Sequence, residues 1–301
     1  MPVFKKRNLV KGLTVKEAMQ RQVVQLPATT PIRQCIRHII KFKANAVMVT
    51  DPHDKPQGVV SKTDIMGAFY AELPVDTRIS DIMVGPPYVC STEDYLETVI
   101  DQMQTLGIHQ IYVQSMTNKD IEGQMAYSDI VGLLYRYCRR CVKSGRCAKM
   151  FAEKGIPRLI AADVMTSNVT SCDAARTITE VIEILSEMKL GAILVTNKGD
   201  SSLGIVSKTD LLLAYIQGAR LDEPAQTIMN SPVTRCNAGI RLSDAIQQLL
   251  LYDIQRIFLP NENNGQVIGV LSLSDATRFR SGTCRACGAG RILGNFLSYS
   301  D

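Results

Sequence analysis

The stretch GVVSKTD at Gly58–Asp64 indicates the fold, because it returns three times along the chain. The later copies are GQMAYSD at Gly123–Asp129, GIVSKTD at Gly204–Asp210 and GVLSLSD at Gly269–Asp275. A second motif precedes each copy and reads VKEAM at Val15–Met19, ISDIM at Ile79–Met83, AADVM at Ala161–Met165 and AQTIM at Ala225–Met229. Both motifs recur with an offset of 146 residues between the two halves of the chain. The sequence therefore predicts four repeats of about 60 residues in two pairs.

Each repeat carries the same pattern of secondary structure. In the first, we expect a strand at Val23–Leu26, a helix from Ile32 to Ile40, strands at Ala46–Thr50 and Gly58–Ser61, and a helix over Ile65–Tyr70. Thr63 or Asp64 is expected to cap that last helix. In the fourth repeat we expect a helix at Ile240–Leu251, strands at Arg256–Leu259 and Val267–Ser272, and Ser274 or Asp275 as the cap.

The order β-α-β-β-α predicts an α/β (α+β) fold. A repeat of this size cannot bury both faces of its sheet alone, so pairing two repeats face to face is expected. The predicted division is repeat 1 at 13–73, repeat 2 at 78–138, a basic, cysteine-containing linker at 139–158, repeat 3 at 159–220, repeat 4 at 225–282, and a tail with a Cys-x-x-Cys motif at 283–301.

Composition excludes few functions, but it bears on the cellular location of the protein and on the chemistry of its cysteines. A hydrophobic fraction of 46% is enough for sizeable cores. No apolar run approaches the roughly 20 residues that span a bilayer, and the N-terminus lacks the apolar core of a secretory signal. We therefore expect a cytoplasmic protein without a membrane segment, whose nine cysteines are thiols, metal ligands or redox groups rather than structural disulfides.

At these motifs the chain resembles the CBS-domain family, whose repeats occur in tandem pairs called Bateman modules. The resemblance covers about residues 13–282 and rests on the V-x-x-h-M turn (h for hydrophobic) and the closing G-h-h-S-x-x-D, each seen four times. It implies two Bateman modules and a regulatory protein that binds adenine nucleotides (AMP, ADP or ATP) or an adenosyl ligand such as S-adenosylmethionine. It also implies self-association, for which we expect a homodimer. We expect the effector, of unknown identity, to act in trans or to be the CBS assembly itself.

The resemblance further implies which residues bind the ligand. The closing Asp would hold the ribose hydroxyls, and the Ser three residues earlier, or its neighbours, would contact phosphate. Repeat 2 departs from this pattern, because Ala126 replaces the Ser. Residues implied near the base are Val24, Thr170 and Thr234. Residues implied at the ribose and phosphate are Ser61, Lys62, Thr63, Asp64, Ser128, Asp129, Ser207, Lys208, Thr209, Asp210, Ser272, Ser274 and Asp275, with His109 and Arg256 as further cations.

Physical chemistry allows two interpretations of this motif. A carboxylate accepts hydrogen bonds from two vicinal hydroxyls, and a helix N-terminus favours phosphate. Ser and Asp are equally the preferred residues of an ordinary helix N-cap. The Gly-rich cradle and GK[ST] of a Walker loop are absent from the sequence.

The cysteines fall into two classes. Cys90, Cys172 and Cys236 lie seven residues after the Met of their repeat, where repeat 1 has Leu26, and Cys35 lies beside Ile36 on a helix, so core packing is expected. Cys138, Cys141, Cys284 and Cys287 form two Cys-x-x-Cys pairs that are 146 residues apart. If they converge, four thiolates would bind Zn²⁺ or an Fe–S cluster, or act as redox pairs. The family does not require these cysteines.

Other classes of function have less support. We find no nucleophile–base–orienter set, since His38, His53 and His109 lie in unrelated contexts, and we expect no enzyme and no required cofactor. The segment from Arg136 to Arg158 carries eight basic residues against one Glu, which suits a solvated connection or an anionic partner. Few aromatic residues lie near it, so nucleic-acid binding is not the expected function.

Overall fold

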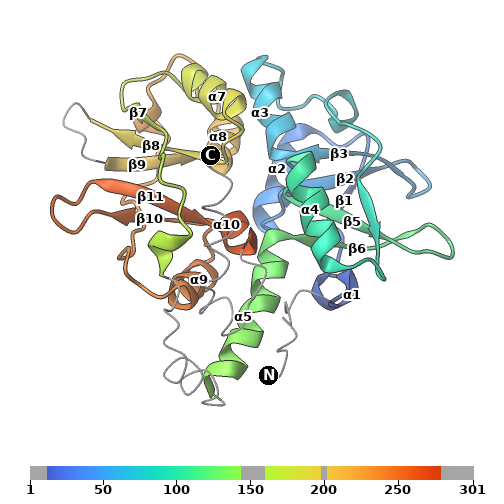
Figure 1. Cartoon of the computed structure of the whole chain (residues 1–301). Helices are drawn as coiled ribbons and strands as arrows, with labels where there is room; N and C mark the ends of the chain where they lie inside the picture. The colour runs from blue at the N-terminus through green and yellow to red at the C-terminus, as the bar shows by residue number, and fades with distance from the viewer. Residues whose placement is uncertain (1–11, 144–159, 198–201, 279–301) are drawn as a thin grey trace, which may run out of the picture. The chain divides into compact units, whose positions relative to one another are not determined.

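The computed structural model of the chain describes residues 12–143, 160–197 and 202–278. Four small β-sheets with accompanying helices make up these residues (Figure 1). Repeat 1 contains β1 (Gln25–Pro27), α2 (Ile32–Lys41), β2 (Ala46–Thr50), β3 (Pro56–Ser61) and α3 (Lys62–Tyr70). This order is the predicted one.

The other repeats follow the same plan. Repeat 2 has β4 (Val89–Ser91), α4 (Leu96–Leu106), β5 (Gln110–Gln114), β6 (Ile121–Ala126) and α5 (Tyr127–Lys143). Repeat 3 has β7 (Ser171–Asp173), α7 (Ile178–Glu187), β8 (Ala192–Thr196), β9 (Ser202–Ser207) and α8 (Lys208–Gln217). Repeat 4 has α9 (Leu242–Leu251), β10 (Arg256–Pro260), β11 (Val267–Ser272) and α10 (Leu273–Arg278).

Sheet topology follows from the burial of the middle strand. In repeat 1, β2 pairs in parallel with β1 and antiparallel with β3, and Val49 is the partner of both Leu26 and Gly58. Every residue of β2 is buried, as the continuous apolar run AVMVT requires. On α2 the buried residues recur at helical spacing and are Ile32, Cys35, Ile36 and Ile39.

Repeat 4 departs from the prediction at its first strand. Its sheet has only two strands, and a single parallel bridge between Arg235 and Phe258 stands where β1 lies in repeat 1. The chain turns immediately afterwards, where the N–H of Gly239 donates to Oδ1 of Asn237 at 2.6 Å, and the same turn follows β7 in repeat 3, where the N–H of Ala175 donates to Oδ1 of Asp173. The difference lies in the middle strand, because Pro260 stands where β8 has Thr196 and has no N–H to continue the parallel ladder.

Each repeat begins with a leading segment that packs on the other repeat of its pair. These segments are residues 14–20, 78–84, 160–166 and 224–230. Their motifs form the short helical turns α1 (Val15–Ala18), η1 (Ile79–Asp81), η2 (Ala161–Asp163) and η3 (Ala225–Thr227). The residue after each Met then bridges to the last strand of the paired repeat, as Gln20↔Gln124, Val84↔Val59, Thr166↔Val270 and Asn230↔Ile205. The exchange joins repeat 1 to repeat 2 and repeat 3 to repeat 4, which is the pairing that the spacing predicts.

This exchange explains the Gly that opens each closing motif. A Cβ at Gly123 would lie 2.5 Å from the backbone oxygen of Gln20, and one at Gly204 would lie 2.6 Å from that of Asn230. Only Gly lets the two backbones approach this closely.

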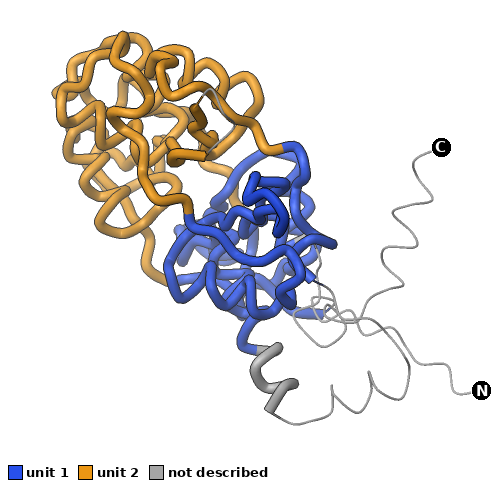
Figure 2. Tube along the Cα trace, turned by 90° about the vertical axis from the view of Figure 1, so that its left-hand side faces the viewer, with its two compact units in different colours: residues 1–20, 90–168, 234–301 blue, residues 21–89, 169–233 orange. Residues whose placement is uncertain are grey.

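The described residues form two compact units, coloured in Figure 2. Unit 1 falls in the ranges Met1–Gln20, Cys90–Asn168 and Thr234–Asp301, and unit 2 in Arg21–Val89 and Val169–Val233. Unit 2 therefore holds the sheets of repeats 1 and 3 with the leading segments of repeats 2 and 4, and unit 1 holds the converse set.

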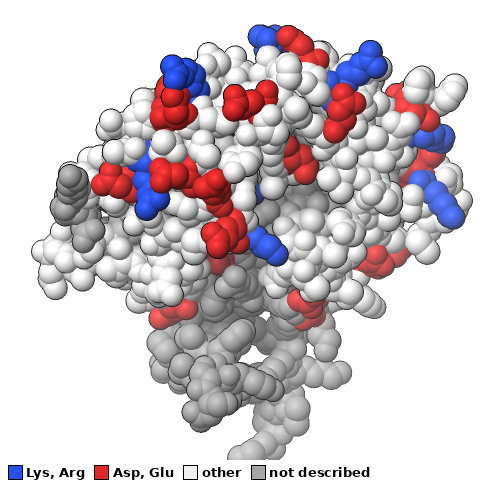
Figure 3. Space-filling model, turned by 90° about the horizontal axis from the view of Figure 1, so that it is seen from above, with Lys and Arg blue, Asp and Glu red and all other residues white. Residues whose placement is uncertain are grey.

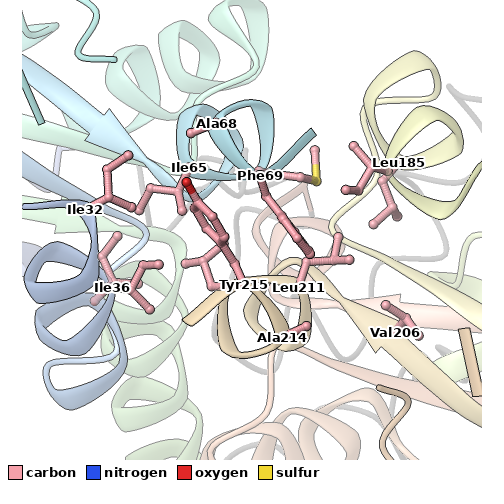
Figure 4. Packing of buried hydrophobic residues seen from close by; sticks show 14 of the residues in the cluster. Ile32, Ile36, Ile65, Ala68, Phe69, Leu185, Val206, Leu211, Ala214 and Tyr215 are labelled. Atoms are coloured by element: carbon pink, nitrogen blue, oxygen red, sulfur yellow. The ribbon is translucent and has the colours of Figure 1, made fainter. Parts of the chain in front are cut away.

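One hydrophobic core runs through each unit. In unit 2, helices α3 and α8 pack together, and the rings of Phe69 and Tyr215 stack between them with centroids 4.8 Å apart (Figure 4). Around them lie buried aliphatic residues from both repeats, including Ile65 and Leu211. In unit 1, α5 packs against α9 and α10. Each core thus unites equivalent repeats from the two halves of the chain.

The predicted core cysteines are confirmed. Cys35, Cys90, Cys172 and Cys236 are buried free thiols. Burial raises the pKa of Cys35 and of Cys90 to about 12 and that of Cys172 to about 11, and it also raises the pKa of Cys236. Among the described residues, no helix is long and apolar enough to cross a membrane.

Candidate functional site

The closing motif of each repeat is a helix N-cap joined to a carboxylate. Ser61 is the N-cap of α3, and its hydroxyl accepts hydrogen bonds from the N–H groups of Thr63 and Asp64. In return, the N–H and the hydroxyl of Ser61 both donate to Oδ2 of Asp64 at 2.7 Å. This is a capping box, in which two otherwise unpaired donors are satisfied reciprocally.

The predicted caps were wrong by two or three residues. Ser61, not Thr63 or Asp64, begins α3, and α10 begins after Ser272, not at Ser274 or Asp275. The physical reason is that an N-cap side chain must reach the N–H groups of the first turn, which the earlier Ser does. The Asp is the third helical residue, and its role in the cap is to accept hydrogen bonds.

Repeats 3 and 4 share this geometry in full, and repeat 2 shares part of it. The N–H and the hydroxyl of Ser207 both donate to Oδ2 of Asp210 at 2.7 Å, and those of Ser272 donate to Asp275 at 2.9 and 2.6 Å. In repeat 2 the N–H of Ala126 donates to Oδ2 of Asp129 at 2.8 Å. The substitution Ser→Ala therefore removes the hydroxyl and leaves the backbone half of the box.

The second carboxylate oxygen distinguishes the repeats. Nε2 of Gln20 donates to Oδ1 of Asp129, and Nδ2 of Asn230 donates to Oδ1 of Asp210, both at 2.5 Å. Oδ1 of Asp64 receives no hydrogen bond from any described residue. Burial raises the pKa of Asp129 and Asp210, although their hydrogen bonds oppose this shift.

Lysines of the two SKTD copies meet in unit 2. Nζ of Lys62 donates to Oγ1 of Thr209 at 3.0 Å, and Nζ of Lys208 donates to Oγ1 of Thr63 at 2.7 Å. The structure thus brings four of the predicted phosphate-contacting residues into one polar group at the N-termini of α3 and α8, which we call the lysine–threonine cluster (Lys62, Thr63, Lys208, Thr209). It places two positive charges beside two helix N-termini.

The residues predicted near the base occupy equivalent places before the first strand or bridge. The backbone oxygens of Val24, Thr170 and Thr234 accept hydrogen bonds from the middle strands, at Met48, Leu194 and Phe258 respectively. The carbonyl groups are therefore engaged within the sheets. A contact of these residues with a base stays a prediction.

Two residues that were predicted to contact phosphate, Arg256 and His109, lie in unit 1. Arg256 begins β10 and is the register partner of Ser272, so it lies beside the cap of α10. The ring of His109 meets that of Tyr127 edge-on, with centroids 5.5 Å apart. Ser128 is the second residue of α5 and is exposed, and Ser274 is the second residue of α10, with its hydroxyl 2.8 Å from that of Ser272.

The cysteine pairs are not tested by this structure. Cys284 and Cys287 lie outside the described residues, and Cys138 and Cys141 lie on α5 where the side chains are not described. Among the described residues, no group of three or more His, Cys, Asp and Glu side chains converges in a way that suits a metal ion. The four-thiolate site stays a prediction.

Surface charge on the described residues is mixed. On the face in Figure 3, Lys and Arg side chains lie interspersed with Asp and Glu, without a broad basic patch. Most of the basic segment from Arg136 to Arg158 lies outside the described residues.

Sequence reasoning missed Gln20 and Asn230. Both follow the Met of a leading segment, where the other repeats have Val84 and Thr166. The signal available in the sequence was an amide at this position in two of the four copies. Its meaning depends on the exchange of leading segments, which spacing alone does not reveal.

Comparison with known proteins agrees with this architecture. The sequence profile of the CBS domain matches residues 15–71, 161–217 and 225–282. These matches together span more than half of the chain and lie within predicted repeats 1, 3 and 4. Repeat 2, which lacks the Ser of the motif, has the same order of helices and strands.

Three of the similar proteins show the extent of the likeness. Uncharacterized protein MK0525 of Methanopyrus kandleri is 27% identical over 115 residues, which is 38% of this chain and 56% of that protein, so the match spans about half of that relative. CBS domain-containing protein YhcV of Bacillus subtilis is 27% identical over 38% of this chain and 79% of its own length. The crystal structure of protein MJ1225 from Methanocaldococcus jannaschii, described as a candidate archaeal homologue of g-AMPK, superposes with a TM-score of 0.73, covers 88% of this chain and 99% of that one, and is 14% identical. This last likeness concerns the fold.

Proposed function

Because the chain belongs to the CBS-domain family, we propose that it is a non-catalytic regulatory protein that binds an adenine nucleotide or S-adenosylmethionine. The ligand changes the protein's interaction with an effector, and the protein acts in trans. The observation that carries the proposal is the carboxylate of Asp64, whose Oδ2 is held by Ser61 while Oδ1 has no donor among the described residues.

The chemistry of this carboxylate suits a ribose. Two vicinal hydroxyls donate hydrogen bonds, and an ionised carboxylate only accepts them. The capping box holds the Asp64 side chain in one orientation before the ligand arrives, which reduces the entropy lost on binding. Charge-assisted bonds of this kind are about twice as strong as neutral ones.

Phosphate groups are assigned to the N-termini of the same helices. The first turn of α3 has a positive dipole end, and Lys62 and Lys208 of the lysine–threonine cluster add two charges there. A nucleotide that competes for these ammonium groups would release Thr63 and Thr209. Regulation follows only if the ligand has different affinities for two arrangements of the protein.

Calorimetric titration tests the proposal. The full chain is titrated with AMP, ADP, ATP and S-adenosylmethionine, and the tightest ligand is then titrated into Asp64→Asn. This variant keeps an oxygen for the capping box and replaces the other oxygen with an amide, so we expect binding at this site to weaken about tenfold or more. Asp76→Asn, which changes an exposed carboxylate beside Arg33, is the matched control and is expected to bind as the wild type does.

A second arm tests the role of the diol. If AMP binds, 2′,3′-dideoxy-AMP keeps its base and phosphate but lacks both hydroxyls, and its affinity for the wild type should fall as the affinity of AMP falls for Asp64→Asn. No binding of any of the four ligands to the wild type would overturn the proposal.

A further inference from the structure

Two of the four closing carboxylates already hold an amide of the chain itself. Asn230 donates to Oδ1 of Asp210, and Gln20 donates to Oδ1 of Asp129, both at 2.5 Å. This oxygen is the one that the capping box leaves open. Each amide therefore occupies a position from which a sugar hydroxyl would donate.

The backbone that carries each amide is held in place by two hydrogen bonds. Asn230 exchanges backbone bonds with Ile205 at 2.8 and 2.9 Å, and Gln20 does so with Gln124 at 2.8 and 2.9 Å. These bridges come from the exchange of leading segments and recur in all four repeats. The residue after the Met is thus directed toward the closing motif of the paired repeat by the fold and not by its side chain.

The same position beside Asp64 holds Val84. Its backbone makes the equivalent bridge with Val59 at 2.7 and 2.9 Å. The side chain of valine has no hydrogen-bond donor, so the neighbour of Asp64 cannot make the bond that Asn230 makes with Asp210.

We propose that Gln20 and Asn230 are internal competitors for the ribose diol, so that Asp64 is occupied first and Asp129 and Asp210 accept a ligand only when the amide is displaced. This inference rests on the proposed function and concerns which copies of the site bind. The ligand must first break the charge-assisted hydrogen bond between the amide and the Asp. The cost of breaking it corresponds to an affinity for the ligand that is about tenfold weaker. The residue after the Met is then a specificity-determining residue for occupancy.

A reciprocal exchange of side chains tests the inference. Asn230→Val gives Asp210 the neighbour that Asp64 has, and Val84→Asn gives Asp64 the neighbour that Asp210 has. With AMP in calorimetry, we expect Asn230→Val to add a site or to tighten the weaker site about tenfold. We expect Val84→Asn to weaken the tight site by a similar factor.

Matched variants distinguish the loss of the amide from misfolding of the protein. Asn230→Leu and Gln20→Met keep the approximate shape of the side chain and remove only the amide, and both positions are exposed. Thr166→Val changes the fourth copy and is expected to leave the affinity at Asp64 unaltered. Each variant is compared with the wild type by circular dichroism before titration.

The outcomes separate the two proposals. If the wild type binds, Asp64→Asn weakens binding, and the exchange at positions 84 and 230 changes neither affinity nor stoichiometry, then the competitor inference is wrong and the proposed function stands. If the wild type binds none of AMP, ADP, ATP and S-adenosylmethionine, the proposed function fails and the inference fails with it.

Discussion

Phe69 of α3 and Tyr215 of α8 stack with ring centroids 4.8 Å apart and an angle of 15° between their planes (Figure 4). They are equivalent residues of repeats 1 and 3, being five residues beyond Asp64 and Asp210. Their contact joins the last helices of two repeats that are far apart in the sequence. The core of unit 2 depends on this pair of helices.

Removal of the Phe69 ring should destabilise unit 2. Because Phe69 is buried, we expect Phe69→Ala to lower the free energy of unfolding by about 3 kcal/mol through lost contacts and a cavity. Chemical denaturation measures this change. Phe42→Ala, at a residue with 41% of its surface exposed, is the control and should cost much less. Equal losses for both variants would contradict the assignment of Phe69 to the core.

Replacing glycine with alanine should change the free energy of unfolding in opposite directions at two positions. A Cβ at Gly204 meets the backbone oxygen of Asn230 at 2.6 Å, so Gly204→Ala should lower the free energy of unfolding by about 2 kcal/mol through overpacking. A Cβ at Gly67, within α3, meets nothing within 4 Å, so Gly67→Ala should raise the free energy of unfolding by about 0.5–1 kcal/mol. Thermal unfolding of the two variants compares them directly. A stable Gly204→Ala protein would argue against the exchange of leading segments.

Because of Asp210, the free energy of unfolding should decrease as pH rises. Burial raises the pKa of this carboxyl in the folded state above its ordinary value, so between the two values the folded state binds more protons than the unfolded state. The contribution of Asp210 to stability is therefore greatest at acid pH and is lost as pH rises through the folded-state pKa. The difference in unfolding free energy between Asp210→Asn and the wild type should shift in favour of the variant as pH increases from about 3.5.

This pH dependence is measured by denaturant unfolding at a series of pH values. Asp76→Asn serves as the control for simple loss of a surface charge. A difference between Asp210→Asn and the wild type that stays constant with pH would show that the Asp210 carboxyl is not perturbed by folding.

The buried thiols should be unreactive in the folded protein. Desolvation raises the pKa of Cys35 and Cys90 to about 12, and alkylation requires the thiolate. With iodoacetamide at pH 8, peptides that contain Cys35, Cys90, Cys172 or Cys236 should stay unmodified until denaturant is added. Mass spectrometry after timed quenching reads this out, and rapid native modification of any of the four would contradict its burial.

Local sequence patterns predicted most secondary structure, because each element carries its own signal. The helix expected from Ile32 to Ile40 is α2, and the strand expected at Ala46–Thr50 is β2 with the same bounds. One error occurred where a residue of another repeat intervenes. The helix expected from Ile240 begins at Leu242, since the carbonyl of Ile240 accepts a hydrogen bond from Ala161 of a leading segment.

The candidate site was also predicted only in part, because some of its contacts are local in the sequence and others are not. The Ser–Asp relation of the closing motif spans three residues, so the sequence contained both its partners, although the cap itself was assigned two or three residues too late. The contacts of Lys62 with Thr209 and of Asn230 with Asp210 span 147 and 20 residues. No local pattern encodes them.

Four features of this protein are encoded locally: the number of repeats, the order of elements within them, the location of most helices and strands, and the carboxylate near a helix N-terminus in every repeat. These features depend on hydrophobic spacing and on hydrogen bonds within a few residues. Three other features emerge only when the chain is folded: leading segments are exchanged between paired repeats, equivalent repeats share one core, and Asp64 differs from Asp129 and Asp210 at its second oxygen. Those outcomes depend on backbone bridges and packing between segments distant in the chain, where a single side chain, Val84 or Asn230, alters an otherwise repeated site.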